Sequence, residues 1–410
     1  MTNAAVFTRT DAVSPKPGLR ARIARRIEAD VRRVGGRIQM GSLKVILPTG
    51  TVLNFGEGAP FGEVTVKDWG ALTALWARGD VGWGEAYVAG LWDSPCIETL
   101  AAVTMLNKQA FEGPLRPNLA ARIAFRLTDR IVRRNNRAGS ERNIRAHYDV
   151  GDDFYRLWLD ASMTYSSALF SEGEDDLARA QALKCQRLLD ITAGTGPRLL
   201  EIGCGWGGFA EAAADAGRDV TAITVSPAQH AYASARLGAR ADVRLQDYRD
   251  IEGQYDAIVS VEMIEAVGER YWPRYFQTLR DRLAPTGRAA LQAIVVDDAT
   301  FPKYRSRSDF IRQHTFPGGM LPSPGEIRKA AREAGLEVDS IFSFAEDYAR
   351  TLRIWLQAFE AALPEIRALG YDDAFVRSWR YYLAISAATF AYGQTDVVHV
   401  ALRHRSSADA

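Results

Sequence analysis

Residues 199–208 read Leu199-Leu200-Glu201-Ile202-Gly203-Cys204-Gly205-Trp206-Gly207-Gly208, and this stretch decides the fold. An apolar strand runs into glycines at positions 203, 205 and 207, and a helix is expected from about Phe209. Glycine tolerates positive φ and lets a ligand approach the backbone, as the carboxyl end of a first parallel strand requires. The stretch therefore predicts an α/β fold with a ligand site at the end of this strand.

The segments around this stretch alternate between strand and helix patterns, which is typical of a doubly wound parallel sheet. The expected strands are Arg198–Ile202, Asp219–Val225, Asp242–Leu245, Ala257–Val261, Ala289–Val296 and Val338–Phe344. We therefore expect one Rossmann-like α/β domain over residues 142–405.

Three features favour S-adenosylmethionine over a dinucleotide as the ligand. Glu201 lies inside the strand end, and the glycines follow G-x-G-x-G without the third glycine at its dinucleotide position. The second strand ends in Thr224-Val225-Ser226 rather than in the acidic residue that binds an NAD ribose. A nicotinamide enzyme and a glycine turn without a ligand are the alternatives.

The front of the chain has a different pattern. Residues 1–18 show no apolar period and are expected to be disordered, whereas Leu19–Val34 reads as an amphipathic, arginine-rich helix. Short strands are expected at Gly41–Leu47, Val52–Phe55 and Glu63–Val66. We expect a small α+β domain over 19–113, with the helix either on its sheet or on a membrane surface, and a basic helical linker over 114–141.

Charge divides the chain unevenly. Residues 1–145 hold 22 Lys and Arg against 13 Asp and Glu, whereas the rest hold 29 against 37. A basic front half suits an anionic membrane surface, although solvated helix faces are an equal alternative. Nucleic acid is not expected as a partner, because no basic motif is interleaved with aromatic residues.

The composition also limits the cellular compartment and the kinds of site that we expect. No apolar run approaches the roughly 18 residues that span a bilayer, and the N-terminus lacks the pattern of a secretory signal. Cys96, Cys185 and Cys204 are irregularly spaced and only five histidines are present, so no metal site is expected. We expect a cytoplasmic protein that acts at the inner membrane face.

Six ordered segments resemble the cyclopropane fatty-acyl-phospholipid synthase family and its mycolic-acid relatives, which are class I S-adenosylmethionine-dependent methyltransferases. They are residues 147–151 (HYDVG), 163–167 (MTYSS), 201–208 (EIGCGWGG), 245–250 (LQDYRD), 316–323 (FPGGMLPS) and 347–352 (DYARTL). The resemblance implies a Rossmann-like methyltransferase sheet preceded by a small lipid-binding-like α+β domain. It also implies a cofactor site made of Tyr165, Ser166, Gly203, Gly205, Thr224, Gln229 and Asp247, and it suggests a homodimer.

In that family a bound bicarbonate removes a proton after methyl transfer, held by a cysteine, a glutamate, a histidine, an isoleucine backbone and a tyrosine. Glu265, Ile294 and Tyr348 match this pattern, whereas Ser167 and Gln292 stand in place of the cysteine and the histidine. Glu262 replaces a small residue, and it would neighbour Glu265 if the two shared a helical turn. Both bicarbonate and a cyclopropane product are therefore in question.

The resemblance implies addition of a methyl-derived carbon across the double bond of an unsaturated phospholipid acyl chain. We hypothesise that Glu265 and Tyr348, with Ser167 and Gln292, form the deprotonation site. Aromatic faces stabilise the intermediate cation, and the candidates are Tyr348, Tyr304, Phe310, Trp355 and Tyr382. Loss of a methyl proton with ring closure gives cyclopropane, and other losses give a methyl or methylene branch. Methylation of a small molecule and lipid binding without catalysis are the remaining alternatives.

Overall fold

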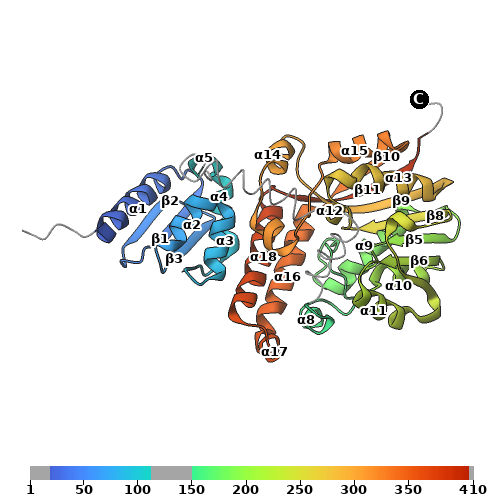
Figure 1. Ribbon diagram of the computed structural model, residues 1–410, viewed down its shortest axis with the longest axis horizontal. Helices are drawn as coiled ribbons and strands as arrows, with labels where there is room; N and C mark the ends of the chain where they lie inside the picture. Colours follow the sequence, from blue (N-terminus) through green and yellow to red (C-terminus); the bar gives the residue numbers. More distant parts are fainter. Residues whose placement is uncertain (1–18, 112–149, 406–410) are drawn as a thin grey trace, which may run out of the picture.

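The computed structural model describes residues 19–111 and 150–405, which build two sheets (Figure 1). We call residues 19–111 the front unit and residues 150–405 the main unit. The segment expected to be disordered (1–18), the expected linker (114–141) and the expected domain boundary at 142 lie outside these residues.

The front unit contains a four-stranded sheet in the order β2-β1-β3-β4. Strand β1 pairs antiparallel with β2 and parallel with β3. Alternate residues of β1, such as Leu43 and Val45, are buried, as expected for a sheet with one covered face. The strands are β1 Gly41–Ile46, β2 Val52–Glu57, β3 Phe61–Val66 and β4 Trp92–Asp93.

Helices cover this sheet, and the basic first helix is one of them. Ile27 of α1 is 3% exposed and packs in the same cluster as Leu43 and Leu53, so this apolar face lies on the sheet of the front unit rather than on a membrane. The helices are α1 Leu19–Gly35, α2 Gly70–Arg78, α3 Asp80–Val88, α4 Ile97–Leu106 and α5 Lys108–Phe111.

The main unit contains a seven-stranded sheet in the order β10-β11-β9-β8-β5-β6-β7. The strands from β9 to β7 are parallel to one another, and β11 is antiparallel to both of its neighbours. This is the Rossmann-like methyltransferase sheet that the sequence predicted. The strands are β5 Arg198–Ile202, β6 Asp219–Thr224, β7 Ala241–Leu245, β8 Tyr255–Val261, β9 Leu283–Val295, β10 Leu336–Ser343 and β11 Asp396–His404.

Strand β11 was not among the expected strands. Its residues are buried almost throughout, because the strand lies inside the sheet between β9 and β10. A short continuous apolar run has no period that separates a buried strand from a buried helix. It also follows a long helix at a place where strand–helix alternation gave no reason to expect an antiparallel strand.

Helices cover both faces of the main sheet and make two apolar layers. Helices α9, α10 and α11 pack on one face, and α13 and α15 pack on the other. The bounds are α8 Asp152–Arg156, α9 Leu177–Ile191, α10 Gly208–Asp215, α11 Pro227–Leu237, α12 Ile264–Val267, α13 Trp272–Arg282, α14 Phe301–Arg305, α15 Pro324–Glu333, α16 Ala345–Ala361, α17 Leu363–Ala368 and α18 Asp373–Ala391.

Helices α16 and α18 stand between the front unit and the main sheet (Figure 1). A Cβ on Gly84 of α3 would overlap the Phe310 ring and lie 2.9 Å from Cε1 of Tyr381, so only glycine lets α3 approach this closely. The Arg377 guanidinium donates to the carbonyl oxygens of Tyr87 (2.6 Å) and Trp92 (2.8 Å). Close packing and a half-buried cation therefore hold the two units together.

Candidate active site

One cavity of about 920 Å³ extends from the interior of the front unit to the carboxyl ends of the main-sheet strands. Its wall in the front unit is mostly apolar, with Asp30, Asp80 and Lys108 as charged members, and in the main unit it includes the glycine loop and a group of carboxyl side chains. The front-unit wall includes Val31, Leu43, Val64, Leu72, Trp76 and Leu100. A cavity of this kind suits a long apolar ligand with a reacting centre at one end.

The glycine loop after β5 presents its backbone to the cavity. Gly203 and Gly205 line it with φ of 83° and 54°, values that favour glycine. A Cβ built on Gly205 would have no heavy atom of the described residues within 4 Å, apart from its chain neighbours. The loop therefore leaves open space directly beside the backbone at Gly205.

The end of β6 supplies polar groups to the same part of the cavity. Thr224 and Gln229 both line it, and the Thr224 hydroxyl donates to Gln229 Oε1 at 2.8 Å. The Ser226 side chain accepts a hydrogen bond from the Gln229 backbone N–H and caps α11. The cap fixes the start of α11 and with it the position of Gln229.

The segment before α9 adds Tyr165 and Ser166, as the family resemblance implied. Both line the cavity, where the Tyr165 hydroxyl donates to the Tyr382 hydroxyl at 2.9 Å. Ser166 Oγ accepts from the Lys184 ammonium at 2.7 Å. Lys184 is fully buried, and burial lowers the pKa of its ammonium.

Asp247 is the one expected cofactor residue that does not line the cavity. Its carboxylate accepts the backbone N–H of Arg249 at 2.9 Å and pairs with the Arg249 guanidinium at 2.6 Å. Its neighbours Gln246 and Tyr248 form the wall instead. The side chain of Asp247 thus caps the short turn after β7.

A polar cluster surrounds the carboxylate of Glu262, which lines the cavity just after β8. Its Oε1 accepts the backbone N–H of Ser167 at 2.9 Å and the Gln292 side-chain amide at 2.8 Å. Its Oε2 accepts the Tyr348 hydroxyl at 2.7 Å. Burial raises the pKa of Glu262, and these three donors oppose that rise by stabilising the carboxylate.

Glu265 is a second carboxyl group in the cavity wall, and its surroundings differ. Its Oε1 accepts the Ile294 backbone N–H at 2.5 Å, and its Oε2 is buried with no hydrogen-bond partner among the described residues. Burial, followed by the nearby Glu262 charge, raises the pKa of Glu265 to about 8. The environments therefore favour a proton on Glu265 and a charge on Glu262.

Two expectations about this cluster change in detail. Glu262 does not share a helical turn with Glu265, because it precedes α12 and adopts a φ of 49°, which is uncommon for a residue other than glycine. Ser167 offers its backbone N–H to the cluster, whereas its hydroxyl donates to the Ala168 carbonyl. Of the groups expected to hold bicarbonate, Gln292 and Tyr348 thus bind the carboxylate of Glu262, whereas the Ile294 backbone N–H binds Glu265.

Aromatic side chains line the space beside these carboxyl groups. Of the expected five, Tyr304, Phe310, Tyr348 and Tyr382 line the cavity. Trp355 does not, and it packs against Trp158 and Tyr165 with ring centroids 5.7 and 5.4 Å apart.

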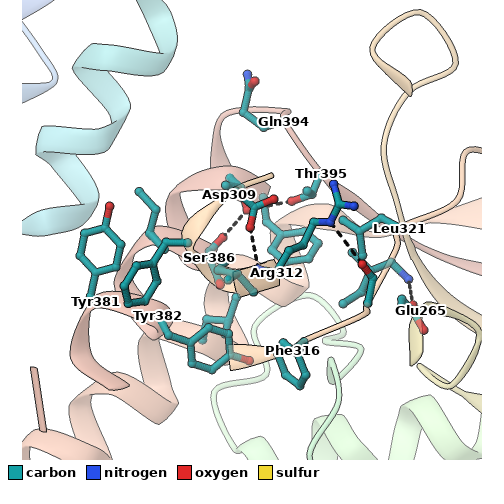
Figure 2. A pocket seen from close by; sticks show the side chains of 18 of the residues that line it. Glu265, Asp309, Arg312, Phe316, Leu321, Tyr381, Tyr382, Ser386, Gln394 and Thr395 are labelled. Carbon is teal, nitrogen blue, oxygen red and sulfur yellow. Dashed lines mark hydrogen bonds between the residues drawn. The ribbon is translucent and has the colours of Figure 1, made fainter. Parts of the chain in front are cut away.

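Phe316 also lines the cavity, although it was not among the expected aromatic residues. Figure 2 shows Phe316 and Tyr382 between Glu265 on one side and Tyr381 on the other. The Phe316 and Tyr382 rings meet edge to face at 5.7 Å. Aromatic rings thus extend from the carboxyl groups towards the front unit.

Sequence reasoning missed Lys184 and His399. Lys184 follows Ala180 and precedes Leu188 on the buried stripe of α9, so a lysine at apolar spacing was an available signal. His399 lies in the unexpected strand β11, where no pattern marked it.

The residues present suit S-adenosylmethionine, which carries a sulfonium and an ammonium group. The backbone beside Gly205 is open, and Glu201, which lines the cavity, has a buried Oε2 without a hydrogen-bond partner among the described residues. Burial raises the pKa of Glu201 to about 8, and a cationic ligand would favour its charged form. Across residues 19–111 and 150–405 no group of His, Cys, Asp and Glu side chains could hold a metal ion, and no helix has the length and apolarity to cross a membrane.

This sheet and this site define a class I S-adenosylmethionine-dependent methyltransferase. The model of the mycolic acid cyclopropane synthetase family matches residues 135–400. The chain belongs to that family.

Relatives and solved structures agree with this assignment. The chain is 38% identical over 335 residues to the tuberculostearic acid methyltransferase UfaA1 of Mycobacterium tuberculosis, covering 78% of each protein. It is 32% identical over 343 residues to the cyclopropane-fatty-acyl-phospholipid synthase of Escherichia coli, covering 82% of this chain and 86% of that one. The crystal structure of mycolic acid cyclopropane synthase CmaA1 complexed with SAH and CTAB is similar with a TM-score of 0.59, at 28% identity over 64% of this chain and 97% of that chain.

Proposed function

We propose that this enzyme methylates the double bond of an unsaturated phospholipid acyl chain and that Glu262 removes the proton that completes the reaction. The observation that carries the proposal is the position of the Glu262 carboxylate among the Ser167 N–H, the Gln292 amide and the Tyr348 hydroxyl. The family resemblance assigned these donors to bicarbonate. A carboxylate of the chain here takes the place expected for an external base.

S-adenosylmethionine, when bound, supplies an electrophilic methyl group. The cavity has to hold an alkene, which is a weak nucleophile, close to that methyl group and away from water. With the cofactor bound, the alkene would take its methyl group through a new carbon–carbon bond, and one alkene carbon would become cationic. The faces of Tyr382, Phe316 and Tyr348 lie along the cavity wall and stabilise this charge without forming a covalent bond.

Whether a hydride shift precedes deprotonation decides between a branch and a ring, because both products lose a proton from the new methyl group. A hydride shift moves the cation to the methylated carbon, and Glu262 then takes a proton from the new methyl group to leave a methylene branch. The atoms balance without an oxidant or a reductant, because one methyl group is gained and one proton is lost. Glu262 could serve as the base for either product, and the similarity to a tuberculostearic acid methyltransferase supports this branch over the cyclopropane ring, which the sequence left in question.

The phospholipid part of the proposal rests on the opposite end of the cavity. Lys108 of the front unit and Lys303 and Arg307 of the main unit line the cavity and are exposed, whereas most of the other residues of the front-unit wall are apolar. An amphipathic molecule with an anionic headgroup matches this order of charged and apolar groups. We place the headgroup at these cations and the acyl chain in the front unit, at an anionic membrane face.

The test uses the full chain, vesicles of dioleoyl phosphatidylglycerol and methyl-deuterated S-adenosylmethionine. Mass spectrometry with two retained deuteriums, together with exocyclic methylene signals in the proton spectrum of unlabelled product, would support the proposal. Two deuteriums with upfield ring-proton signals would overturn the branch and establish cyclopropanation. Label in free oleate but not in the phospholipid would overturn the phospholipid assignment. No label in either lipid would overturn the acyl-chain reaction in favour of a small-molecule substrate.

A further inference from the structure

Three neighbouring strands carry a chain of buried polar side chains that ends at Glu262. His399 on β11 lies directly opposite Gln292 on β9 in the antiparallel register, and β8 leads directly into Glu262. His399 Nε2 lies 2.9 Å from Gln292 Oε1, and Gln292 Nε2 lies 2.8 Å from Glu262 Oε1. The order of the three groups follows the order of the strands in the sheet.

Hydrogen-bond chemistry fixes the direction of this chain. Gln292 Nε2 also lies 3.2 Å from the Ser167 carbonyl oxygen, so both of its hydrogens face acceptors. A flipped amide would place its oxygen against a carboxylate and a carbonyl, where no hydrogen is present. Gln292 Oε1 therefore faces His399, and because an amide oxygen only accepts, His399 Nε2 has to carry the hydrogen.

The surroundings of His399 fit this single tautomer. The side chain is 1% exposed, and its Nδ1 has no hydrogen-bond partner in the described part of the chain, as expected for a nitrogen without a proton. The Phe344 ring packs against the imidazole at a centroid distance of 4.6 Å. Burial, with the nearby charges of Lys184 and Arg187, lowers the pKa of His399 to about 3, so the ring is neutral near pH 7.

We propose that His399 is a positioning residue for the reaction, which acts by holding the Gln292 amide so that it donates to the Glu262 carboxylate. This inference rests on the proposed role of Glu262. The imidazole does not line the cavity, and its hydrogen bond joins it to Gln292 rather than to Glu262, so it acts through Gln292. Each bond of such a chain polarises the next in a low-dielectric interior, so the last donor is stronger and better aimed.

The tautomer provides a test that needs no turnover. The full chain labelled with ¹⁵N-histidine contains five histidines, and the H399Q variant assigns the His399 signal. We expect a neutral ring with the proton on Nε2 from pH 6 to pH 8. A proton on Nδ1, or a charged ring in this range, would overturn the proposal whatever the lipid product is.

Kinetics on the same lipid vesicles test the role in the reaction. H399F keeps a ring beside Phe342 and Phe344 but removes the donor, whereas H399Q keeps a donor. We expect H399F to lower kcat ~10-fold with an unchanged KM for S-adenosylmethionine, and H399Q to recover most of the loss. Equal losses in both variants would mean that the imidazole is needed only for packing, which would overturn the proposal.

The pH profile separates positioning from a general loss of structure. The groups that face Glu262 are Tyr348, Gln292, Ser167, Glu265 and Lys184. Weakening the Gln292 donor raises the pKa of Glu262, so the acid limb of kcat in H399F should move to higher pH. An unmoved limb would contradict the proposal. In a Q292L background H399F should lower kcat no further, because the amide through which His399 acts is already absent. A further decrease in kcat that adds to that of Q292L would contradict the proposal.

These outcomes remain distinct from failure of the proposed function. If E262Q kept full activity, Glu262 would not be the base, yet the His399 tautomer would still report whether the chain of donors exists. If E262Q were inactive and His399 carried its proton on Nδ1, the result would agree with Glu262 as the base but would overturn the positioning role of His399.

Discussion

The carboxyl groups of Glu262 and Glu265 stand three residues apart, yet three donors surround the first and one donor meets the second. Burial alone would raise the pKa of both groups, so the difference in donors decides which of them keeps the charge. Pairs of acids in unequal environments are a common way to divide the roles of base and proton holder. We therefore assign the base to Glu262 and the retained proton to Glu265.

Replacing the base should stop the reaction without removing the cofactor. We expect E262Q to lower kcat by roughly 10²–10⁴-fold, the usual contribution of a positioned base. Calorimetry should find unchanged affinity for S-adenosylmethionine. E346Q, which changes an exposed glutamate of α16, is the matched control and should behave as the parent. More than a tenth of the parent kcat in E262Q would contradict the assignment.

Replacing Glu265 should change kcat less than replacing Glu262 does, and the change should depend on pH. Its pKa of about 8 means that it is protonated near neutral pH, and glutamine resembles that form. As pH rises through about 8 the parent gains a second buried charge beside Glu262, and we expect kcat to fall. E265Q should keep most of the activity at pH 7, and its kcat should no longer decrease as the pH rises through about 8. An inactive E265Q would favour the original hypothesis, in which Glu265 itself belongs to the deprotonation site.

Cofactor binding should be coupled to ionisation of Glu201. Since burial raises the pKa of Glu201 to about 8, the unliganded protein holds a proton there at pH 7. A cationic ligand favours the carboxylate, so binding should release a proton, which calorimetry in buffers of different ionisation enthalpy measures. E201Q should bind more weakly without proton release, whereas E172Q at an exposed position should be unchanged. Equal proton release in E201Q would place the titrating group elsewhere.

Turnover should be independent of bicarbonate. Gln292 and Tyr348, two of the groups expected to hold that ion, already bind Glu262, and in the proposed mechanism Glu262 is the base. Rates in buffer stripped of carbon dioxide should match those with added bicarbonate. A bicarbonate-dependent rate would show that Glu262 has to give way to the external ion.

Close packing between the two units should be sensitive to one methyl group. Gly84→Ala places a Cβ against the Phe310 ring and Tyr381 Cε1, and overpacking of this kind typically costs about 1–3 kcal/mol. We expect a lower Tm in thermal unfolding. Phe310→Ala removes Cγ and Cδ2, the ring atoms at the clash, so Gly84→Ala should lower the Tm less in that background than in the parent. An unchanged Tm for Gly84→Ala would mean that α3 moves away at little cost.

Much of the fold could be predicted from local pattern. The expected strand Arg198–Ile202 coincides with β5, and the other expected strands lie within two residues of those observed, except that β9 begins six residues before the expected Ala289. Apolar runs bounded by glycine and turn residues mark such strands well. Strand β11 could not be found this way, because its partners β9 and β10 are chosen by tertiary packing.

The cofactor half of the site could also be anticipated, since glycines and strand ends leave a local signature. Thr224, at the end of β6, accordingly lines the cavity, and Gln229, which only the family resemblance implied, lines it too. The contact of Glu262 with Ser167, 95 residues away, could not be anticipated from spacing. Lys184 and His399 are brought to the site by the packing of whole helices and strands. This packing cannot be predicted from the spacing of residues in the sequence.

The place of β11 has a consequence for how the enzyme matures. Among the described strands β10 joins the sheet only through β11, and His399 lies 107 residues after its partner Gln292. A nascent chain can pair β5 to β9 and form the glycine loop well before β11 is synthesised, whereas pairings across such a separation form late. We therefore expect the growing polypeptide to be able to bind S-adenosylmethionine before it can remove a proton from the substrate. The two parts of the active site would form in the order of the sequence.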